Sequence, residues 1–73
     1  MVHITERTNG VLTNHIELRF GDIDRVVKLY KTIGYEEDPF FTTPEWGRYC
    51  LLRADGKNNK EIYIEEETDY ETT

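Results

Sequence analysis

The sequence predicts an α+β domain in which one amphipathic helix covers one face of a mainly antiparallel four-stranded sheet, preceded by an N-terminal strand. Two observations predict this class. Residues 15–20 and 61–65 alternate strictly between apolar and polar side chains, as strands with one buried face do. Residues 23–33 instead repeat apolar side chains every three or four positions, which is the period of a helix. At this length the whole chain, residues 1–73, is expected to form a single domain.

The two alternating stretches each have an apolar side and a polar side. In the first, Ile16, Leu18 and Phe20 alternate with His15, Glu17 and Arg19. In the second, Ile62 and Ile64 alternate with Glu61, Tyr63 and Glu65. Because successive side chains of a strand point to opposite faces, we expect one apolar face under the helix and a second face rich in His, Glu, Arg and Tyr.

The predicted helix has a signal at each end. Asp22 is placed to cap its N-terminus, and Gly34 is placed to end it in the left-handed conformation. Its apolar stripe consists of Ile23, Val26, Val27, Tyr30 and Ile33. We expect this stripe to pack on Ile16, Leu18 and Phe20 of the first alternating strand.

A hairpin is predicted over residues 2–18, because Asn9-Gly10 is the dipeptide most favoured in two-residue type I′ turns. A regular ladder around this turn sets Ile4 opposite His15. His3 and His15 then point to opposite faces of the sheet. We therefore do not expect these two histidines to bind one metal ion together.

Three further strands are predicted after the helix. They are residues 35–43, an edge or bulged strand because it contains Asp38-Pro39, then residues 48–54 and residues 61–67. Residues 43–47 and 55–59 have the composition of turns, and residues 68–73 form an acidic tail. The domain thus divides into an N-terminal arm (1–13), a strand-helix-strand-strand-strand module (14–67) and the tail.

One face of this sheet is expected to lack a cover. It carries His15, Glu17, Arg19, Tyr49, Leu51, Arg53, Glu61 and Tyr63, while Cys50, Leu52 and Ala54 face the helix. A face that mixes polar and apolar groups is suited to meet a partner. A second copy of the chain is the simplest candidate, because small oligomers are mostly two-fold homodimers.

Composition excludes several classes of function. Six of the fifteen acidic residues and none of the nine basic residues lie in residues 61–73, so a basic surface for nucleic acid is not predicted. Cys50 is the only cysteine, which excludes an intramolecular disulfide and fits a reducing compartment. No apolar run reaches the length of a membrane span. We expect a cytoplasmic protein with no membrane partner and no nucleic-acid partner.

Four stretches occur in a suggestive order. They are His15-Ile-Glu-Leu-Arg-Phe-Gly-Asp22, Leu29-Tyr30-Lys-Thr-Ile-Gly34-Tyr35, Arg48-Tyr-Cys-Leu-Leu and Glu61-Ile-Tyr-Ile-Glu65. Together, residues 14–67 resemble the βαβββ module of the vicinal oxygen chelate superfamily. That superfamily includes glyoxalase I, the fosfomycin-resistance enzymes, the extradiol dioxygenases and the bleomycin-resistance proteins.

The resemblance implies a metal site. In metal-dependent members, a histidine on the first strand and a glutamate on the fourth point into a cup that two modules close. His15 and Glu61 match these positions, and Glu61 is the expected proton carrier. The expected ligand-binding residues are Glu17, Arg19, Tyr49, Arg53 and Tyr63. Because the chain has one module, a homodimer is expected to close the barrel around one Ni, Zn, Mn or Fe ion per two chains.

Two hypotheses of function follow. The first is a metal-dependent enzyme of the lyase or isomerase type, in which the ion polarises vicinal oxygens of a small molecule. The second is a metal-free module that holds a small ligand in the cup or a basic protein partner on its acidic C-terminal tail. For Arg19 the alternative is a salt bridge to Glu17 or Glu65, and for Tyr49 and Tyr63 it is dimer packing.

Overall fold

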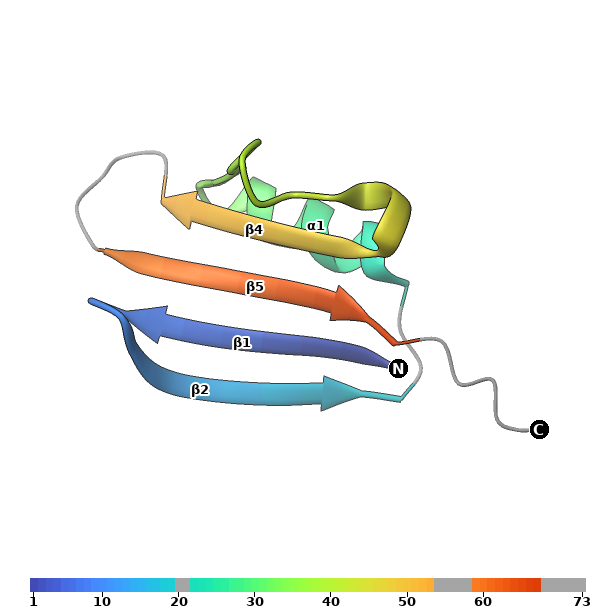
Figure 1. The fold of residues 1–73 in the computed structure, drawn as a ribbon, viewed down its shortest axis with the longest axis horizontal. Helices are drawn as coiled ribbons and strands as arrows, with labels where there is room; N and C mark the ends of the chain where they lie inside the picture. The colour runs from blue at the N-terminus through green and yellow to red at the C-terminus, as the bar shows by residue number, and fades with distance from the viewer. Residues whose placement is uncertain (20–21, 54–58, 68–73) are drawn as a thin grey trace.

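A small α+β domain with a five-stranded antiparallel sheet is seen in the computed structural model, which describes residues 1–19, 22–53 and 59–67 (Figure 1). The strands are β1 (Val2–Thr8), β2 (Val11–Leu18), β3 (Tyr35–Glu37), β4 (Arg48–Arg53) and β5 (Lys60–Glu66). Their order in the sheet is β2-β1-β5-β4-β3, so β2 and β3 are the edges. The predicted class, the N-terminal hairpin and the edge position of the strand after the helix are confirmed.

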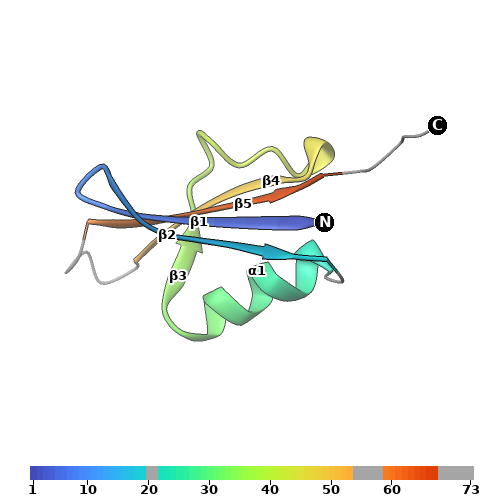
Figure 2. The ribbon, with the colours of Figure 1, turned by 90° about the horizontal axis from the view of Figure 1, so that it is seen from below.

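The helix α1 (Ile23–Thr32) lies on one face of the sheet (Figure 2). Its predicted ends are confirmed: the Asp22 carboxylate accepts a hydrogen bond from the Asp24 N–H (3.0 Å), and Gly34 has a positive φ of 104°. Ile23 and Val27 are buried. Ile33 is exposed, so its inclusion in the apolar stripe was wrong, because the helix ends one residue before it.

The helix approaches β3 and β5 most closely, rather than β2. The core consists of Val2, Ile4, Ile23, Val27, Tyr35, Leu51, Ile62 and Ile64. Leu18 packs against this core, but Ile16 is 37% exposed, so the expected seat for the helix was wrong at Ile16. The reason is topological: β1, not β2, is the neighbour of β5. Phe20 lies outside the described residues.

The β1–β2 hairpin contains a bulge. Asn9 and Gly10 form the predicted turn, with positive φ values of 54° and 79°. The pairing of the strands then shifts by one residue between Glu6 and Arg7, which leaves Thr13 as the extra residue of β2. The Thr13 hydroxyl donates to the Glu6 carbonyl (3.2 Å) at this point.

This bulge decides which face His15 occupies. Beyond it, Thr5 lies opposite His15 and His3 lies opposite Glu17. Directly paired residues of antiparallel strands point to the same face, so both histidines lie on the side away from α1. The prediction that His3 and His15 face opposite sides was wrong, because a one-residue shift moves every later side chain of a strand to the other face.

The faces of β4 are the reverse of the prediction. Tyr49 and Leu51 pair with Ile64 and Ile62, so they face the helix, as does Arg53, two residues further along β4. Placing these three residues on the uncovered face was wrong. The alternation of β4 is ambiguous, because it has apolar side chains on both sides.

Cys50 lies on the side away from the helix and is nevertheless buried. The chain leaves the sheet after β3 and crosses this side (Figure 2). There the Asp38 N–H donates to the Cys50 carbonyl (2.8 Å), and the Cys50 N–H donates to the Thr42 hydroxyl (3.2 Å). Of the predicted strand 35–43, only Tyr35–Glu37 forms a strand. The residues that follow lie over Cys50.

The predicted turn over residues 43–47 is confirmed as a short 3₁₀ helix, Pro44–Trp46, followed by Gly47 in the left-handed conformation with φ 68°. The expectations for Ala54, for residues 55–58 and for the tail 68–73 lie outside the described residues. We call the side of the sheet away from α1 the open face. It carries His3, Thr5, Arg7, His15, Glu17, Glu61, Tyr63 and Glu65.

Candidate metal centre

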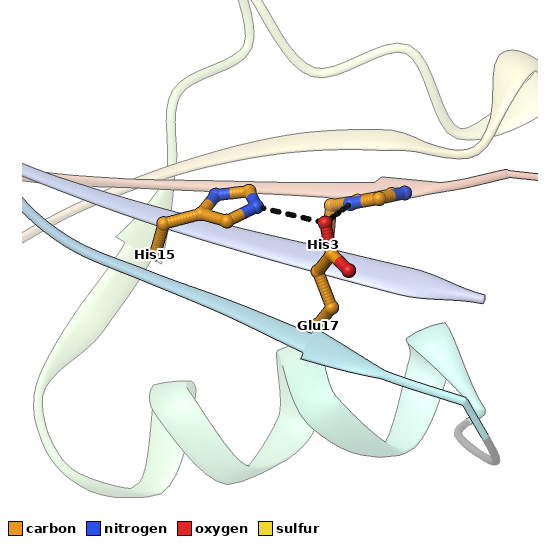
Figure 3. Close-up of side chains that lie close together, drawn as sticks. All are labelled: His3, His15 and Glu17. Carbon is orange, nitrogen blue, oxygen red and sulfur yellow. Dashed lines mark hydrogen bonds and ion pairs between the residues drawn. The ribbon is translucent and has the colours of Figure 1, made fainter.

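The open face brings together three side chains that can bind a metal ion: His3 from β1, and His15 and Glu17 from β2 (Figure 3). One ligand atom of each lies within 4.8 Å of the other two. His3 pairs directly with Glu17 across the two strands, and the next pair on the same face is Thr5 with His15, so the three groups lie over the same part of the hairpin. All three side chains are partly exposed, so an ion from solution can reach them.

The carboxylate of Glu17 forms direct contacts with both imidazoles, at distances that ligands of one metal ion can also have. The Oε2 atom of Glu17 lies 3.5 Å from Nδ1 of His3 and 3.4 Å from Nε2 of His15. Hydrogen bonds between nitrogen and oxygen are usually about 2.7–3.2 Å long. Ligand atoms about 2.1 Å from a tetrahedral ion are separated by roughly 3.4 Å. The two carboxylate–imidazole distances therefore match the separation of ligands around one ion, and all three ligand atoms lie within 4.8 Å of one another.

The outer nitrogen of each imidazole is held by another side chain. Nε2 of His3 lies 2.7 Å from Oε1 of Glu67. An ionised carboxylate only accepts hydrogen bonds, so this nitrogen is the donor, and in a neutral ring Nδ1 directs its lone pair toward Glu17. Nδ1 of His15 lies 3.1 Å from the hydroxyl of Thr5. Outer partners of this kind orient the histidine ligands of metal sites.

The sheet positions these outer partners. Thr5 is the direct cross-strand partner of His15, so its hydroxyl lies beside the imidazole. Glu67 follows β5 directly, and its N–H donates to the Met1 carbonyl (2.8 Å), which extends the β1–β5 pairing to this residue. The two imidazoles stack with their centroids 5.8 Å apart. The cluster therefore comes from β1 and β2, and its outer partners come from β1 and from the residue that follows β5.

A shallow hollow of about 410 Å³ lies beside the cluster. It is lined by His3, Thr5, His15, Trp46, Arg48, Glu65, Glu66 and Glu67. Three of these groups are carboxylates and only one is a guanidinium, that of Arg48, which forms an ion pair with Glu65 (3.3 Å). This excess of negative charge favours a cation at the cluster.

Of the predicted metal ligands, the structure places His15 in the cluster and Glu61 elsewhere. Glu61 is on the open face, but it lies on β5 opposite Arg7. β1 separates β5 from β2, and two strand spacings amount to about 10 Å. His15 and Glu61 therefore do not come together within one chain. Glu17, predicted only to line the ligand site, takes the carboxylate position beside His15.

The remaining predicted ligand-binding residues are divided between the two faces. Tyr63 is on the open face, where burial first, and then Cys50 and Glu61, raise the pKa of its phenol. Tyr49 is on the helix side and donates to Oδ1 of Asp24 (3.4 Å). The Arg53 guanidinium lies 5.7 Å from the centre of the Tyr35 ring.

Arg19 is exposed just beyond the end of β2. The expected salt bridge of Arg19 to Glu17 or Glu65 is not formed within the described part of the chain. Glu17 faces the two histidines, and Glu65 pairs with Arg48.

Three members of this centre were missed by the sequence analysis: His3, Thr5 and Glu67. A signal for His3 was present. Placing Ile4 and Ile16 on one apolar face requires a one-residue bulge in the hairpin, and that bulge also brings His3 to the side of His15. Glu67 has no such signal, because its role depends on pairing between the two ends of the chain.

No protein-family model, curated protein or solved structure matches the chain. The relation to the vicinal oxygen chelate superfamily therefore stays a prediction made from residue patterns. Over residues 1–19, 22–53 and 59–67, no helix is long and apolar enough to cross a membrane.

Proposed function

We propose that this protein binds a divalent transition-metal ion on its open face through His3, His15 and Glu17. The observation that supports this most strongly is the spacing of 3.4 and 3.5 Å between the carboxylate oxygen and the two inner imidazole nitrogens. Two histidines and one carboxylate are a ligand set used by zinc and by non-haem iron. Three protein ligands leave positions on the ion for water or for a small ligand.

An ion held there would act as a Lewis acid toward oxygen atoms of a small molecule entering the hollow beside Trp46 and Arg48. This is the chemistry expected from the vicinal oxygen chelate resemblance, with His3 and Glu17 in place of Glu61. Because one chain supplies three ligands, we propose one ion per chain. A homodimer is proposed only as a cover for the open face.

Metal titration tests this proposal. Protein stripped with a chelator is titrated with Zn²⁺, Ni²⁺, Mn²⁺ and Fe²⁺ by calorimetry, and the bound metal is quantified. We expect one ion per chain in the unmodified protein and no tight binding in His3→Ala or His15→Ala. Thr5→Val and Glu67→Gln are expected to weaken binding about 10- to 100-fold, because each of these side chains contacts the outer nitrogen of a histidine ligand and orients its ring. Glu36→Gln is the matched control, since Glu36 is an exposed acid of β3.

Metal binding should also stabilise the fold. At a free zinc concentration of about 100 times Kd, the free energy of unfolding should rise by about 2.7 kcal/mol. For a chain of this size that corresponds to an increase in Tm of about 10–20 °C. The increase should vanish in His3→Ala and persist in Glu36→Gln. A folded protein that takes up none of the four ions would contradict the proposal and favour the metal-free interaction module.

A further inference from the structure

A second hollow on the open face lies next to the metal centre. Its volume is about 450 Å³. The residues that line it include Thr5, Arg7, Phe41, Arg48, Tyr63 and Glu65. Thr5, which holds the His15 imidazole, lines both hollows, as do Arg48 and Glu65. Its remaining walls differ from those of the first hollow, since they include two aromatic rings and a second guanidinium.

The aromatic wall from Phe41 is presented by a well-anchored segment. Phe41 is 65% exposed and its neighbour Phe40 is 90% exposed. The segment that carries them is hydrogen-bonded to β4 through Asp38 and Thr42, at 2.8 Å and 3.2 Å from Cys50. Large apolar side chains held out to solvent on an anchored segment indicate a contact surface.

Positive charge in this hollow comes from Arg7. Its guanidinium lies 5.8 Å from the centre of the Tyr63 ring. Among the described residues no carboxylate lies within ion-pair distance of Arg7, whereas the guanidinium of Arg48 is already paired with Glu65. Glu61 lies opposite Arg7 on β5, and its charge contributes to raising the pKa of the Tyr63 phenol, after burial and Cys50. Arg7 is thus an available cation beside two aromatic rings.

We propose that this hollow binds an aromatic carboxylate, with its ring between Phe41 and Tyr63 and its carboxylate on Arg7. A planar ring matches the aromatic walls, and a guanidinium forms two parallel hydrogen bonds with a carboxylate. An uncharged aromatic molecule would form no ion pair with Arg7, and an aliphatic acid would not stack on the aromatic side chains. The proposal does not depend on an ion at the metal centre.

Calorimetry with chelator-treated protein tests the ligand class. The probes are 2-naphthoate, 2-naphthamide, which has the same shape without the charge, and cyclohexanecarboxylate, which has the charge without the aromatic ring. We expect 2-naphthoate to bind saturably and about tenfold more tightly than either of the others. Equal binding of 2-naphthamide would show an apolar surface without anion recognition and would overturn the proposal, as would no saturable binding of 2-naphthoate.

Matched variants test the residues. Arg7→Gln and Phe41→Ala are each expected to lower the affinity for 2-naphthoate about tenfold. Arg25→Gln removes the same charge from an exposed helix position, and Phe40→Ala removes the same ring from a residue outside the hollow. Both controls should bind as the unmodified protein does, and circular dichroism checks that all four variants are folded. Losses of the same size in variants and controls would contradict the assignment.

Discussion

The two faces of the sheet are specified by different physical rules. On the covered face, Ile62 and Ile64 are fully buried under α1, and the alternation of β5 fixes their direction. On the open face, the histidines are partly exposed, and their direction is set by a strand pairing that accommodates one extra residue, Thr13, as a bulge. Burial therefore determines the covered face directly, whereas the candidate metal centre depends on a detail of strand pairing.

The largest expected effect is on the covered face. Ile16, Ile4 and Ile64 lie in one row across three strands, and their exposure decreases from 37% to 5% to 0%. Ile64→Ala should lower the free energy of unfolding by about 2–5 kcal/mol, whereas Ile16→Ala should cost less than about 1 kcal/mol. Urea unfolding of both variants measures the difference. Equal costs would show that β2 takes part in the core as fully as β5 does.

A smaller effect is expected from Cys50, which is buried on the side away from the helix. Burial, and then the charge of Asp38, raise the pKa of its thiol above the ordinary value of 9.0. The folded state thus keeps this proton to higher pH than the unfolded state does. The resulting stabilisation is complete below pH 9.0 and is lost as the pH rises through the pKa of the thiol in the folded state. The free energy of unfolding decreases over this range by no more than about 1.4 kcal/mol per pH unit.

Urea midpoints between pH 8 and pH 11 measure this loss. The decrease in stability with pH should be steeper in the unmodified protein than in Cys50→Ala, which has no thiol to ionise. The slopes are compared rather than the absolute stabilities, because removal of a buried side chain lowers stability at every pH. Parallel slopes would contradict the burial of this thiol.

The smallest effect is expected from deletion of Thr13. Removing the extra residue leaves a regular ladder in which Thr5 still lies opposite His15 and His3 still lies opposite Glu17. We expect zinc affinity in the deletion variant to stay within about threefold of the unmodified value, and calorimetry measures it. A complete loss of binding would mean that the bulge itself, rather than the pairing beyond it, shapes the centre.

The fold could be predicted where one physical signal dominates. The cap at Asp22, the helix, the Asn9-Gly10 turn and the edge strand after Gly34 each follow from local chemistry and are confirmed. The faces of β4 could not be predicted from its pattern. Both sides of β4 are buried, one by α1 and the other by the segment that leaves β3, so its apolar residues do not alternate with polar ones.

The candidate site was predicted only in part. His15 and Glu17 follow from the alternation of one strand, and the structure brings them together. Their partner was sought on the last strand at Glu61, because the resemblance to the vicinal oxygen chelate module implies a glutamate ligand there. β1 lies between β2 and β5, and it supplies His3 in place of Glu61. Such an exchange of neighbours depends on contacts between residues more than forty positions apart, which no local pattern encodes.

The ring nitrogens of His3 and His15 test the metal centre most directly, because these are the only histidines in the chain. Their ¹⁵N NMR signals can be followed as zinc is added to chelator-treated protein. The account predicts that Nδ1 of His3 and Nε2 of His15 shift together and saturate at one ion per chain, while the outer nitrogens keep their protons. Unchanged signals, or a response of one histidine alone, would contradict it.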